Sequence, residues 1–406
     1  MRFCMATTFY PPFSYGGDAT YVRALSRALV ARGHEVDVIA STDAYLLRSP
    51  YPDGILAEED DGVRVHRLRH TFGDFAALVS QQSGRTGLYA GTLARLLAEP
   101  YDVLHYHNVS LIGGPGILSM GRARVRLYSL HEHWLVCPTH ILWKNRKEAC
   151  ERPACFSCSL RSKLPPQLWR HTGFRDRQLA YVDKLLSPSE FTAERHRADG
   201  VTRPIRVLPL FSALDQTAQP KMVHCRPSVL FVGRITSSKG VEQLSRVAAT
   251  LPEIDCLIVG DGDLLATLAQ KYAKYPHIRF TGPLPQPALI AEYSRASALI
   301  VPSVAPETFG LTIVEAAACG TPSIVAAASG GAAEIVTATG GGVLYEGDDG
   351  LAGAIRRLVD DHNLCSRLGG LARRGYEDRY TQQRHIASYL HEVDSILEQK
   401  ASCAQS

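Results

Sequence analysis

The sequence predicts an α/β protein with two doubly wound domains, in which helices cover both faces of a mainly parallel sheet. Three observations support this prediction. Short apolar runs alternate with amphipathic helical patterns from one end of the chain to the other. The chain has 406 residues, which is longer than a domain built around a single hydrophobic core usually is. The alternation stops at the polar stretch 214–227 and then restarts, so we expect the domain boundary there.

The first domain, 1–213, contains apolar runs with helical segments between some of them. The runs that predict strands or lead into loops are 1–8, 35–41, 101–108, 124–133, 183–191 and 204–213. Two segments, 21–33 and 192–200, have the pattern of helices.

The second domain, 214–380, repeats this arrangement. Its predicted strands are 228–234, 255–262, 278–284, 298–303, 322–327 and 341–347. Its predicted helices are 240–251, 264–275, 288–297 and 309–319. The last segment, 381–406, is predicted to be a long amphipathic helix that packs back toward the first domain. Such domains bind ligands at the carboxyl ends of their strands.

Composition and charge exclude several classes of protein. The chain is 45% apolar and 21% charged, with a net charge of +4, so we expect no nucleic-acid partner. The first residues lack the apolar core of a signal peptide, and no apolar run reaches the ~18 to 20 residues that span a bilayer. We therefore expect a cytoplasmic protein.

Glu315 lies within the otherwise apolar predicted helix 309–319. A buried carboxylate needs a partner, because an isolated buried charge is costly. On a helical wheel Glu315 shares a face with Leu311 and Thr312, near the helix N-terminus. Free backbone N–H groups at that end attract anions. This geometry indicates a ligand with hydroxyl groups at one end and phosphate beside them.

Loops that follow other strands of the second domain carry further candidate residues. Arg234 and Lys239 follow a central strand and would fit a diphosphate, although solvated loop cations are the alternative. Gly260 lies in a tight strand-to-helix turn, and the loop that ends at Leu284 could present backbone groups to a base. Each feature is also compatible with an ordinary loop.

In the first domain, Gly16 and Gly17 separate the first strand from the first helix and would let a ligand approach the backbone. Their spacing does not match the dinucleotide-binding fingerprint, which disfavours an oxidoreductase. His107 and His131 each end a predicted strand. A single histidine in such a position is more often structural than functional.

The ordered set of motifs resembles the retaining GT-B glycosyltransferases, specifically glycosyltransferase family 4. The resemblance covers nearly the whole chain. Its strongest element is the E-x7-E pair, Glu307 and Glu315, within "PETFGLTIVEAAACGTP". The segments that support it are "FVGRITSSKGVEQL", "LIVGDGD", "DVLHYHN", "LHEHWLVCP" and "SPSEF". The chain departs from the family pattern at Leu210 and Phe211, where many relatives carry Asn-Gly or Asn-Pro.

The resemblance implies a role for each candidate residue. Glu315 would accept hydrogen bonds from the ribose hydroxyls of a nucleotide-sugar, and Arg234 and Lys239 would hold its diphosphate. Glu307 would bind hydroxyls of the donor sugar, and His131 would lie near the anomeric end. Gly17 would leave room for the sugar and phosphate. The backbone amides of three residues would assist: Phe309, Gly310 and Leu311.

The resemblance also implies the reaction. A hexose would pass from a UDP-sugar or GDP-mannose to a hydroxyl of a glycan or lipid-linked acceptor, with retention of configuration and without a catalytic metal. Two alternatives stay open. One is a sugar-nucleotide epimerase or hydrolase on the same scaffold, and the other is a non-catalytic protein that binds nucleotides or glycans.

A cysteine-rich insertion at 137–177 contains four closely spaced thiols, Cys137, Cys150, Cys155 and Cys158. Their C-x12-C-x4-C-x2-C spacing favours a structural zinc site, with free thiols and disulfides as the alternatives. The same insertion mixes basic residues with leucines, which suggests a peripheral contact with the inner face of a membrane. A solvated basic face is the competing interpretation.

Overall fold

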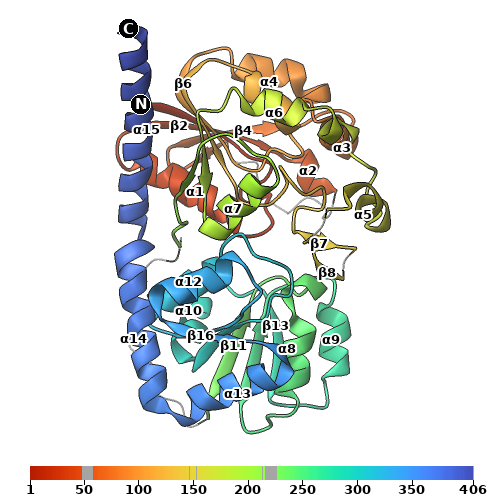
Figure 1. Ribbon diagram of the computed structural model, residues 1–406, viewed down its shortest axis with the longest axis vertical. Helices are drawn as coiled ribbons and strands as arrows, with labels where there is room; N and C mark the ends of the chain where they lie inside the picture. Colours follow the sequence, from red (N-terminus) through yellow and green to blue (C-terminus); the bar gives the residue numbers. More distant parts are fainter. Residues whose placement is uncertain (48–57, 146, 152, 213, 215–225, 406) are drawn as a thin grey trace. The chain divides into compact units, whose positions relative to one another are not determined.

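The computed structural model describes residues 1–47, 58–145, 147–151, 153–212, 214 and 226–405 (Figure 1). It confirms the predicted α/β class, with parallel sheets in two Rossmann-like units. Unit 1 comprises Met1–His140, Ala154–Pro209 and Gln382–Ser406, and unit 2 comprises Ile141–Pro153 and Leu210–Thr381. The predicted boundary at 214–227 lies mostly outside the described residues, and the chain passes from unit 1 to unit 2 after Pro209. Residues 141–153, expected in the first domain, group with unit 2.

Unit 1 is built on an eight-stranded sheet of order β10-β9-β6-β5-β1-β2-β4-β3. Its pairs are parallel except β3 with β4. The strands are β1 Arg2–Ala6, β2 Glu35–Ser41, β3 Glu59–Asp60, β4 Val63–Leu68, β5 Tyr101–Tyr106, β6 Ala123–Ser129, β9 Lys184–Ser187 and β10 Ile205–Val207. The chain order reverses between β1 and β5, where this sheet has its topological switch point.

The helical elements of unit 1 include several that the sequence patterns did not predict, above all those between residues 43 and 96. They are α1 Gly17–Val30, α2 Asp43–Leu46, α3 Asp74–Ser83, η1 Gly87–Tyr89, α4 Ala90–Leu96, η2 Gly114–Ser119, α5 Cys155–Arg161, η3 Leu168–His171, α6 Phe174–Leu179, α7 Glu190–Ala198 and α15 Gln382–Gln405. The final helix, α15, belongs to unit 1 by its contacts.

Unit 2 is built on a six-stranded parallel sheet of order β13-β12-β11-β14-β15-β16. The strands are β11 Ser228–Val232, β12 Asp255–Val259, β13 Ile278–Gly282, β14 Ala298–Val301, β15 Ser323–Ala326 and β16 Gly342–Tyr345. The short strands β7 Trp143–Lys144 and β8 Glu148–Ala149 form a separate pair. The switch point lies between β11 and β14, which are neighbours in the sheet but not in sequence.

Helices cover both faces of the unit 2 sheet. They are η4 Ser237–Lys239, α8 Val241–Ala248, α9 Leu265–Lys271, α10 Gln286–Arg295, α11 Leu311–Ala318, α12 Gly331–Thr339, α13 Gly347–Asp360 and α14 His362–Arg379. Alternate residues of the strands, such as Val229 and Phe231, enter one buried cluster with Leu244 and Ile355 from α8 and α13. The predicted helix 309–319 is α11, which begins at Leu311 after Gly310.

Candidate functional site

The loops at the carboxyl end of the unit 2 sheet bring several predicted residues together. Arg234 and Lys239 follow β11, and Glu307 follows β14, on the two sides of the switch point. Both Val304 N and Ala305 N donate to Ser238 O at 3.1 Å, which joins the two loops directly. Ile235 N donates to Asp261 O at 2.8 Å and adds the loop after β12. This edge of the sheet is therefore held by backbone hydrogen bonds and does not depend on side chains alone.

Two glycines permit this close approach of the loops. Gly240 has a φ of 68°, and a Cβ placed there would lie 1.8 Å from Pro302 O. Gly260 has a φ of 136°, and its Cβ would lie 1.9 Å from Gly233 O. Both conformations are unfavourable for residues with side chains. The predicted role of Gly260 in a tight turn thus has a steric reason.

Lys239 and Glu307 form an ion pair at this edge. Lys239 Nζ lies 2.5 Å from Oε1 and 2.6 Å from Oε2 of Glu307. Ser303 Oγ donates to Oε1 of the same carboxylate at 2.5 Å. The backbone of Glu307 is held as well, because its N–H donates to Ser329 O and its carbonyl accepts from Gly331 N, each at 2.9 Å. A fixed carboxylate beside a lysine can bind hydroxyl groups and an anion at neighbouring positions.

Glu315 has a partner, as its position in an apolar helix requires. Tyr293 in α10 donates its hydroxyl to Oε2 of Glu315 at 2.6 Å. Burial raises the pKa of Glu315 to about 7, although the Tyr293 hydrogen bond acts in the opposite direction. The carboxylate is therefore poorly solvated and would gain from additional hydrogen-bond donors.

The remaining predicted residues of unit 2 lie on the same loops. Gly310 directly precedes α11, and a Cβ added at this glycine would lie 2.9 Å from Ile313 Cδ1. Phe309 is buried, and its ring lies 6.0 Å from that of Tyr380. Arg234 is exposed and has no ion pair with any residue that the structure describes. Leu284 follows β13 and is half-buried.

In unit 1, the predicted residues lie after three strands: Gly16 and Gly17 after β1, His107 after β5 and His131 after β6. Gly16 has a φ of 84° and directly precedes Gly17, the first residue of α1. His131 Nε2 lies 2.9 Å from His107 Nδ1, and the two rings are stacked. Burial and the neighbouring His385 lower the pKa of His131 to about 3. The His131 ring is consequently neutral near pH 7 and could donate or accept a hydrogen bond, but not act as a cation.

Some residues near these sites were not identified from the sequence. Asp18, in the first turn of α1, has a pKa raised to about 6 by burial and by the Glu132 carboxylate. Glu132 Oε2 lies 2.8 Å from His140 Nδ1. Ser303 and Tyr293 were also missed. Ser303 could have been noticed as the residue that ends a predicted strand just before Glu307, whereas nothing in the sequence links Tyr293 to Glu315.

The structure gives the predicted zinc site no support. Cys137, Cys155 and Cys158 belong to unit 1. Burial raises the pKa of Cys155, and the nearby thiols of Cys137 and Cys158 raise it further. Cys150 groups with unit 2. Within the described ranges, no group of three or more His, Cys, Asp or Glu side chains is arranged to hold a metal ion.

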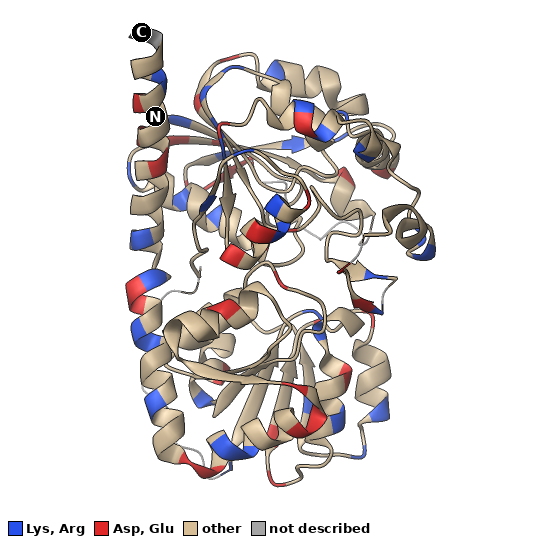
Figure 2. Ribbon diagram, in the orientation of Figure 1, with Lys and Arg blue, Asp and Glu red and all other residues tan. Residues whose placement is uncertain are grey.

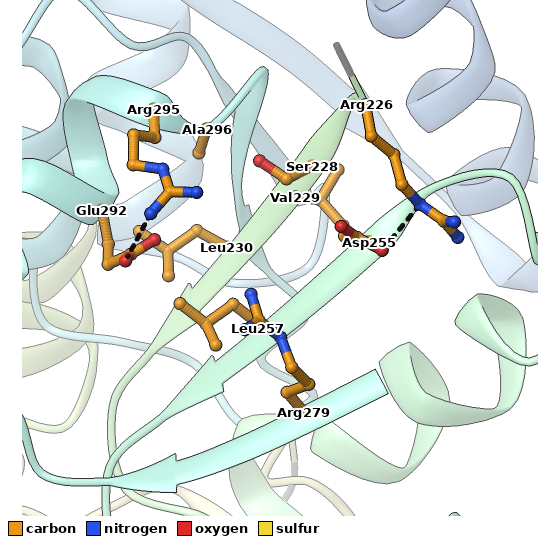
Figure 3. Close-up of a pocket in the computed structure, with 10 residues that line it drawn as sticks. All are labelled: Arg226, Ser228, Val229, Leu230, Asp255, Leu257, Arg279, Glu292, Arg295 and Ala296. Carbon is orange, nitrogen blue, oxygen red and sulfur yellow. Dashed lines mark hydrogen bonds and ion pairs between the residues drawn. The ribbon is translucent and has the colours of Figure 1, made fainter. Parts of the chain in front are cut away.

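A cavity of about 260 Å³ in unit 2 lies away from these loops (Figure 3). It is lined by residues near the amino ends of β11, β12 and β13 and by the end of α10. Arg226 pairs with Asp255 at 2.7 Å and Arg295 with Glu292 at 3.3 Å, as the dashed lines in Figure 3 show. Doubly wound sheets bind ligands at the opposite, carboxyl edge, so this cavity is not the candidate site.

Comparison with known proteins gives consistent matches over both halves of the chain. Residues 15–215 match the family model described as Glycosyltransferase Family 4, and residues 216–375 match Glycosyl transferases group 1. A D-inositol 3-phosphate glycosyltransferase from Catenulispora acidiphila is 42% identical, over 85% of this chain and 84% of the relative. Glycogen synthase from Mycobacterium tuberculosis is 29% identical, over 92% of this chain and 89% of the relative.

Solved structures share the fold. Sucrose-phosphate synthase from Thermosynechococcus elongatus superposes with a TM-score of 0.71 at 21% identity, over 98% of this chain and 99% of that chain. Anabaena HepE, solved in complex with UDP and glucose, has a TM-score of 0.66 at 17% identity, with both chains fully covered. Across the described helices, none is long and apolar enough to cross a membrane.

Proposed function

Because the chain belongs to the group 1 and family 4 glycosyltransferases, we propose that it transfers a hexose from a nucleoside diphosphate sugar to an acceptor hydroxyl, with retention of anomeric configuration. The acceptor is a glycan or a lipid-linked saccharide. The arrangement of Lys239, Ser303 and Glu307 at the unit 2 switch point is the observation that carries the proposal. It combines a cation, a hydroxyl and a fixed carboxylate at the edge where such sheets bind ligands.

The donor would be bound from its nucleoside to its sugar along the unit 2 loops. Glu315 accepts hydrogen bonds from the ribose hydroxyls through the carboxylate that Tyr293 orients. Arg234 and Lys239 bind the diphosphate, helped by the amides of Phe309, Gly310 and Leu311 at the start of α11. The loops after β12 and β13, with Gly260 and Leu284, face the base. Glu307 accepts hydrogen bonds from the hexose hydroxyls.

In the reaction, the bond between the anomeric carbon and the diphosphate oxygen breaks, and the acceptor oxygen bonds to that carbon on the same face. The acceptor proton passes to the departing diphosphate oxygen. Lys239, Arg234 and the helix amides stabilise the negative charge that develops there. Lys239 and Ser303 already engage the Glu307 carboxylate, which makes it a poor nucleophile and supports direct attack by the acceptor. The family resemblance implies that His131, whose ring is neutral, acts as a hydrogen-bonding group near the anomeric end of the hexose.

The relatives support this choice of substrates. Among proteins similar to this chain are a glycogen synthase and several D-inositol 3-phosphate glycosyltransferases. The HepE structures contain UDP, and one contains UDP-glucose. A nucleoside diphosphate hexose is therefore the donor class to test first, as UDP-glucose and GDP-mannose.

The test is an incubation of the protein with each donor, with and without an acceptor mixture of short glucans and glycosylated lipids. Nuclear magnetic resonance of the product at early times reports the anomeric configuration. A product with the configuration of the donor supports the proposal. Release of free hexose that acceptors do not suppress would instead indicate a hydrolase, and inversion would exclude the retaining mechanism.

A surface of unit 1 supports the lipid-linked acceptor. We call it the apolar surface and define it by exposed side chains on α3, η1 and η3 or next to them: Phe72, Phe75, Leu78, Leu88 and Leu168. Phe72, Phe75 and Leu168 are 63%, 59% and 67% exposed. Trp169 Nε1 donates to Gln81 O at 3.2 Å and joins η3 to α3. Exposed apolar patches of this kind commonly mark interaction sites.

The charge around the apolar surface favours an anionic lipid surface as its partner. The sequence 154–181 contains five Lys or Arg residues and one acidic residue, and the end of α5 is blue in Figure 2. Arg161, the last residue of α5, and Lys163 are exposed. Apolar side chains flanked by cations bind interfaces by insertion together with attraction to anionic headgroups. Peripheral binding of this kind would bring unit 1 to an acceptor carried by the membrane. Trp169 in the same segment is buried and takes no part.

A further inference from the structure

His385, in the first turn of α15, makes two hydrogen bonds that determine its tautomer. Its Nδ1 lies 2.7 Å from the carbonyl oxygen of Pro209, and its Nε2 lies 2.7 Å from the Tyr21 hydroxyl. A carbonyl oxygen only accepts, so Nδ1 carries the proton. Burial lowers the pKa of His385 to about 4, which keeps the ring neutral. Nε2 must then accept the proton of the Tyr21 hydroxyl.

These bonds join three parts of unit 1 that are remote in sequence. Pro209 is the last residue of unit 1 before the chain passes to unit 2, and Gln382, three residues before His385, is the first after it returns. Tyr21 lies in α1, the helix that begins at Gly17. One buried side chain therefore anchors both passages of the chain and helix α1.

Tyr21 also contacts His131. The two rings lie 5.2 Å apart, and the Tyr21 and His385 rings lie 5.4 Å apart and perpendicular to each other. On its other side His131 is hydrogen-bonded to His107, whose ring lies 3.9 Å from that of His105. His105 in turn bonds Ser129 and Tyr389 of α15 at 2.9 and 3.0 Å. His131 is thus held between two groups of residues that both reach α15.

We propose that Tyr21 and His385 are positioning residues for His131, and that they connect its placement to the two passages between the units. The proposal rests on the role of His131 in the proposed function. Tyr21 is 2% exposed and His385 is 3% exposed, so they act on the ring of His131 and do not bind the donor themselves. Loss of their hydrogen bond should lower the rate of transfer without weakening nucleotide binding in unit 2.

The test uses variants that remove one hydrogen bond at a time. Tyr21→Phe keeps the ring and removes the hydroxyl. His385→Asn keeps a donor near Nδ1 for Pro209, whereas His385→Gln keeps an acceptor near Nε2 for Tyr21. The matched control is Tyr376→Phe in unit 2, because the buried Tyr376 hydroxyl has no hydrogen-bond partner among the described residues.

We expect Tyr21→Phe and His385→Asn each to lower kcat about 10-fold, or about 1.4 kcal/mol, and the double variant to fall no further, because both remove the same link. The donor KM, the nucleoside diphosphate Kd and the Tm should stay close to those of Tyr376→Phe. Unchanged kcat in Tyr21→Phe, or a loss explained by KM alone, would overturn the proposal.

A second measurement keeps the proposal testable if the wild-type protein transfers no hexose. Nitrogen chemical shifts of isotope-labelled histidines report the tautomer of each ring. We expect His385 as the Nδ1–H form in the wild type, and a displaced His131 resonance in Tyr21→Phe but not in Tyr376→Phe. An unmoved His131 resonance would contradict the positioning role, whatever the result of the transfer assay.

Discussion

Lys239 Nζ is equidistant, within 0.1 Å, from the two carboxylate oxygens of Glu307, at 2.5 and 2.6 Å. The pair is partly exposed, with 25% of the lysine and 20% of the glutamate side chain accessible. Its charges are therefore balanced before any ligand binds, and a diphosphate must compete with Glu307 for the lysine. Because of this competition, substitutions of Glu307 and of Lys239 should change diphosphate affinity in opposite directions.

Neutralising Glu307 should strengthen binding of a bare diphosphate and weaken catalysis. In Glu307→Gln the lysine keeps its charge and loses its anionic partner, so we expect a several-fold lower Kd for the nucleoside diphosphate. Transfer should fall about 10² to 10³-fold, the magnitude typical of a lost charged contact in a transition state. Lys239→Ala should lose both binding and transfer. Titration calorimetry and initial rates give the two readouts, and weaker diphosphate binding in Glu307→Gln would contradict the competition.

Nucleotide binding near pH 7 should release protons from Glu315. Its pKa in the folded protein is about 7, and ribose hydroxyls that donate to the carboxylate would lower it. Calorimetry in buffers of different ionisation enthalpy measures the number of protons released. We expect a fraction of one proton at pH 7 in the wild type and none in Glu315→Gln. Proton uptake on binding would rule out this role.

The same shift predicts how Glu315 affects stability. Because its pKa is raised above the ordinary value of 4.5, the folded protein holds a proton that the unfolded chain releases between about pH 4.5 and 7. The contribution of Glu315 to folding free energy therefore falls as pH rises through that window. Glu315→Gln should remove this component of the pH dependence, which denaturant unfolding at several pH values would measure. A pH dependence identical to that of the wild type would contradict the raised pKa.

The loop contact at Gly240 should be essential for the candidate site. Gly240→Ala places a Cβ against Pro302 O at a φ of 68°, and we expect a loss of at least about 1 to 3 kcal/mol in the free energy of unfolding. Gly353 in α13 is the control, because a Cβ there meets no atom within 4 Å. Gly353→Ala should be neutral or stabilising by about 0.5 to 1 kcal/mol. Equal stability of the two variants would show that the loops are not packed as described.

The apolar surface can be tested with lipid vesicles. We expect the protein to sediment with vesicles that contain phosphatidylglycerol and not with pure phosphatidylcholine, and to dissociate as salt is raised. A Phe72→Ser, Phe75→Ser double variant should bind at least about 10-fold more weakly. Leu344→Ser, at an exposed leucine of unit 2, should bind like the wild type. Failure of the wild type to bind anionic vesicles would exclude this surface as a membrane contact.

Much of the fold was predictable, because buried parallel strands appear as short apolar runs. The six strands of the parallel sheet of unit 2 were each anticipated, and so was α11 with Glu315 inside it. The segments 43–96 and 347–379 were not assigned to elements. Their helices mix apolar and polar residues, and β4 Val63–Leu68 alternates between them, so these segments lack the short apolar runs that mark buried strands. Within unit 1, the meeting of His107 and His131 follows from the pairing of β5 with β6, which a single sequence does not specify.

The contacts that complete the site were harder to predict. Tyr293 and Ser303 reach Glu315 and Glu307 from other elements, so their roles depend on tertiary packing. Zinc binding by the four closely spaced cysteines stays a prediction, because spacing along the chain does not determine which side chains the fold brings together.

The most direct test of the account is calorimetric titration of UDP, GDP and ADP into the wild-type protein and into Glu315→Ala. We predict that one of the three diphosphates binds selectively and that Glu315→Ala binds it at least about 10-fold more weakly while its Tm changes little. Equal affinity in the two proteins would contradict the placement of the nucleotide at Glu315, and with it the central claim that the unit 2 loops bind the donor.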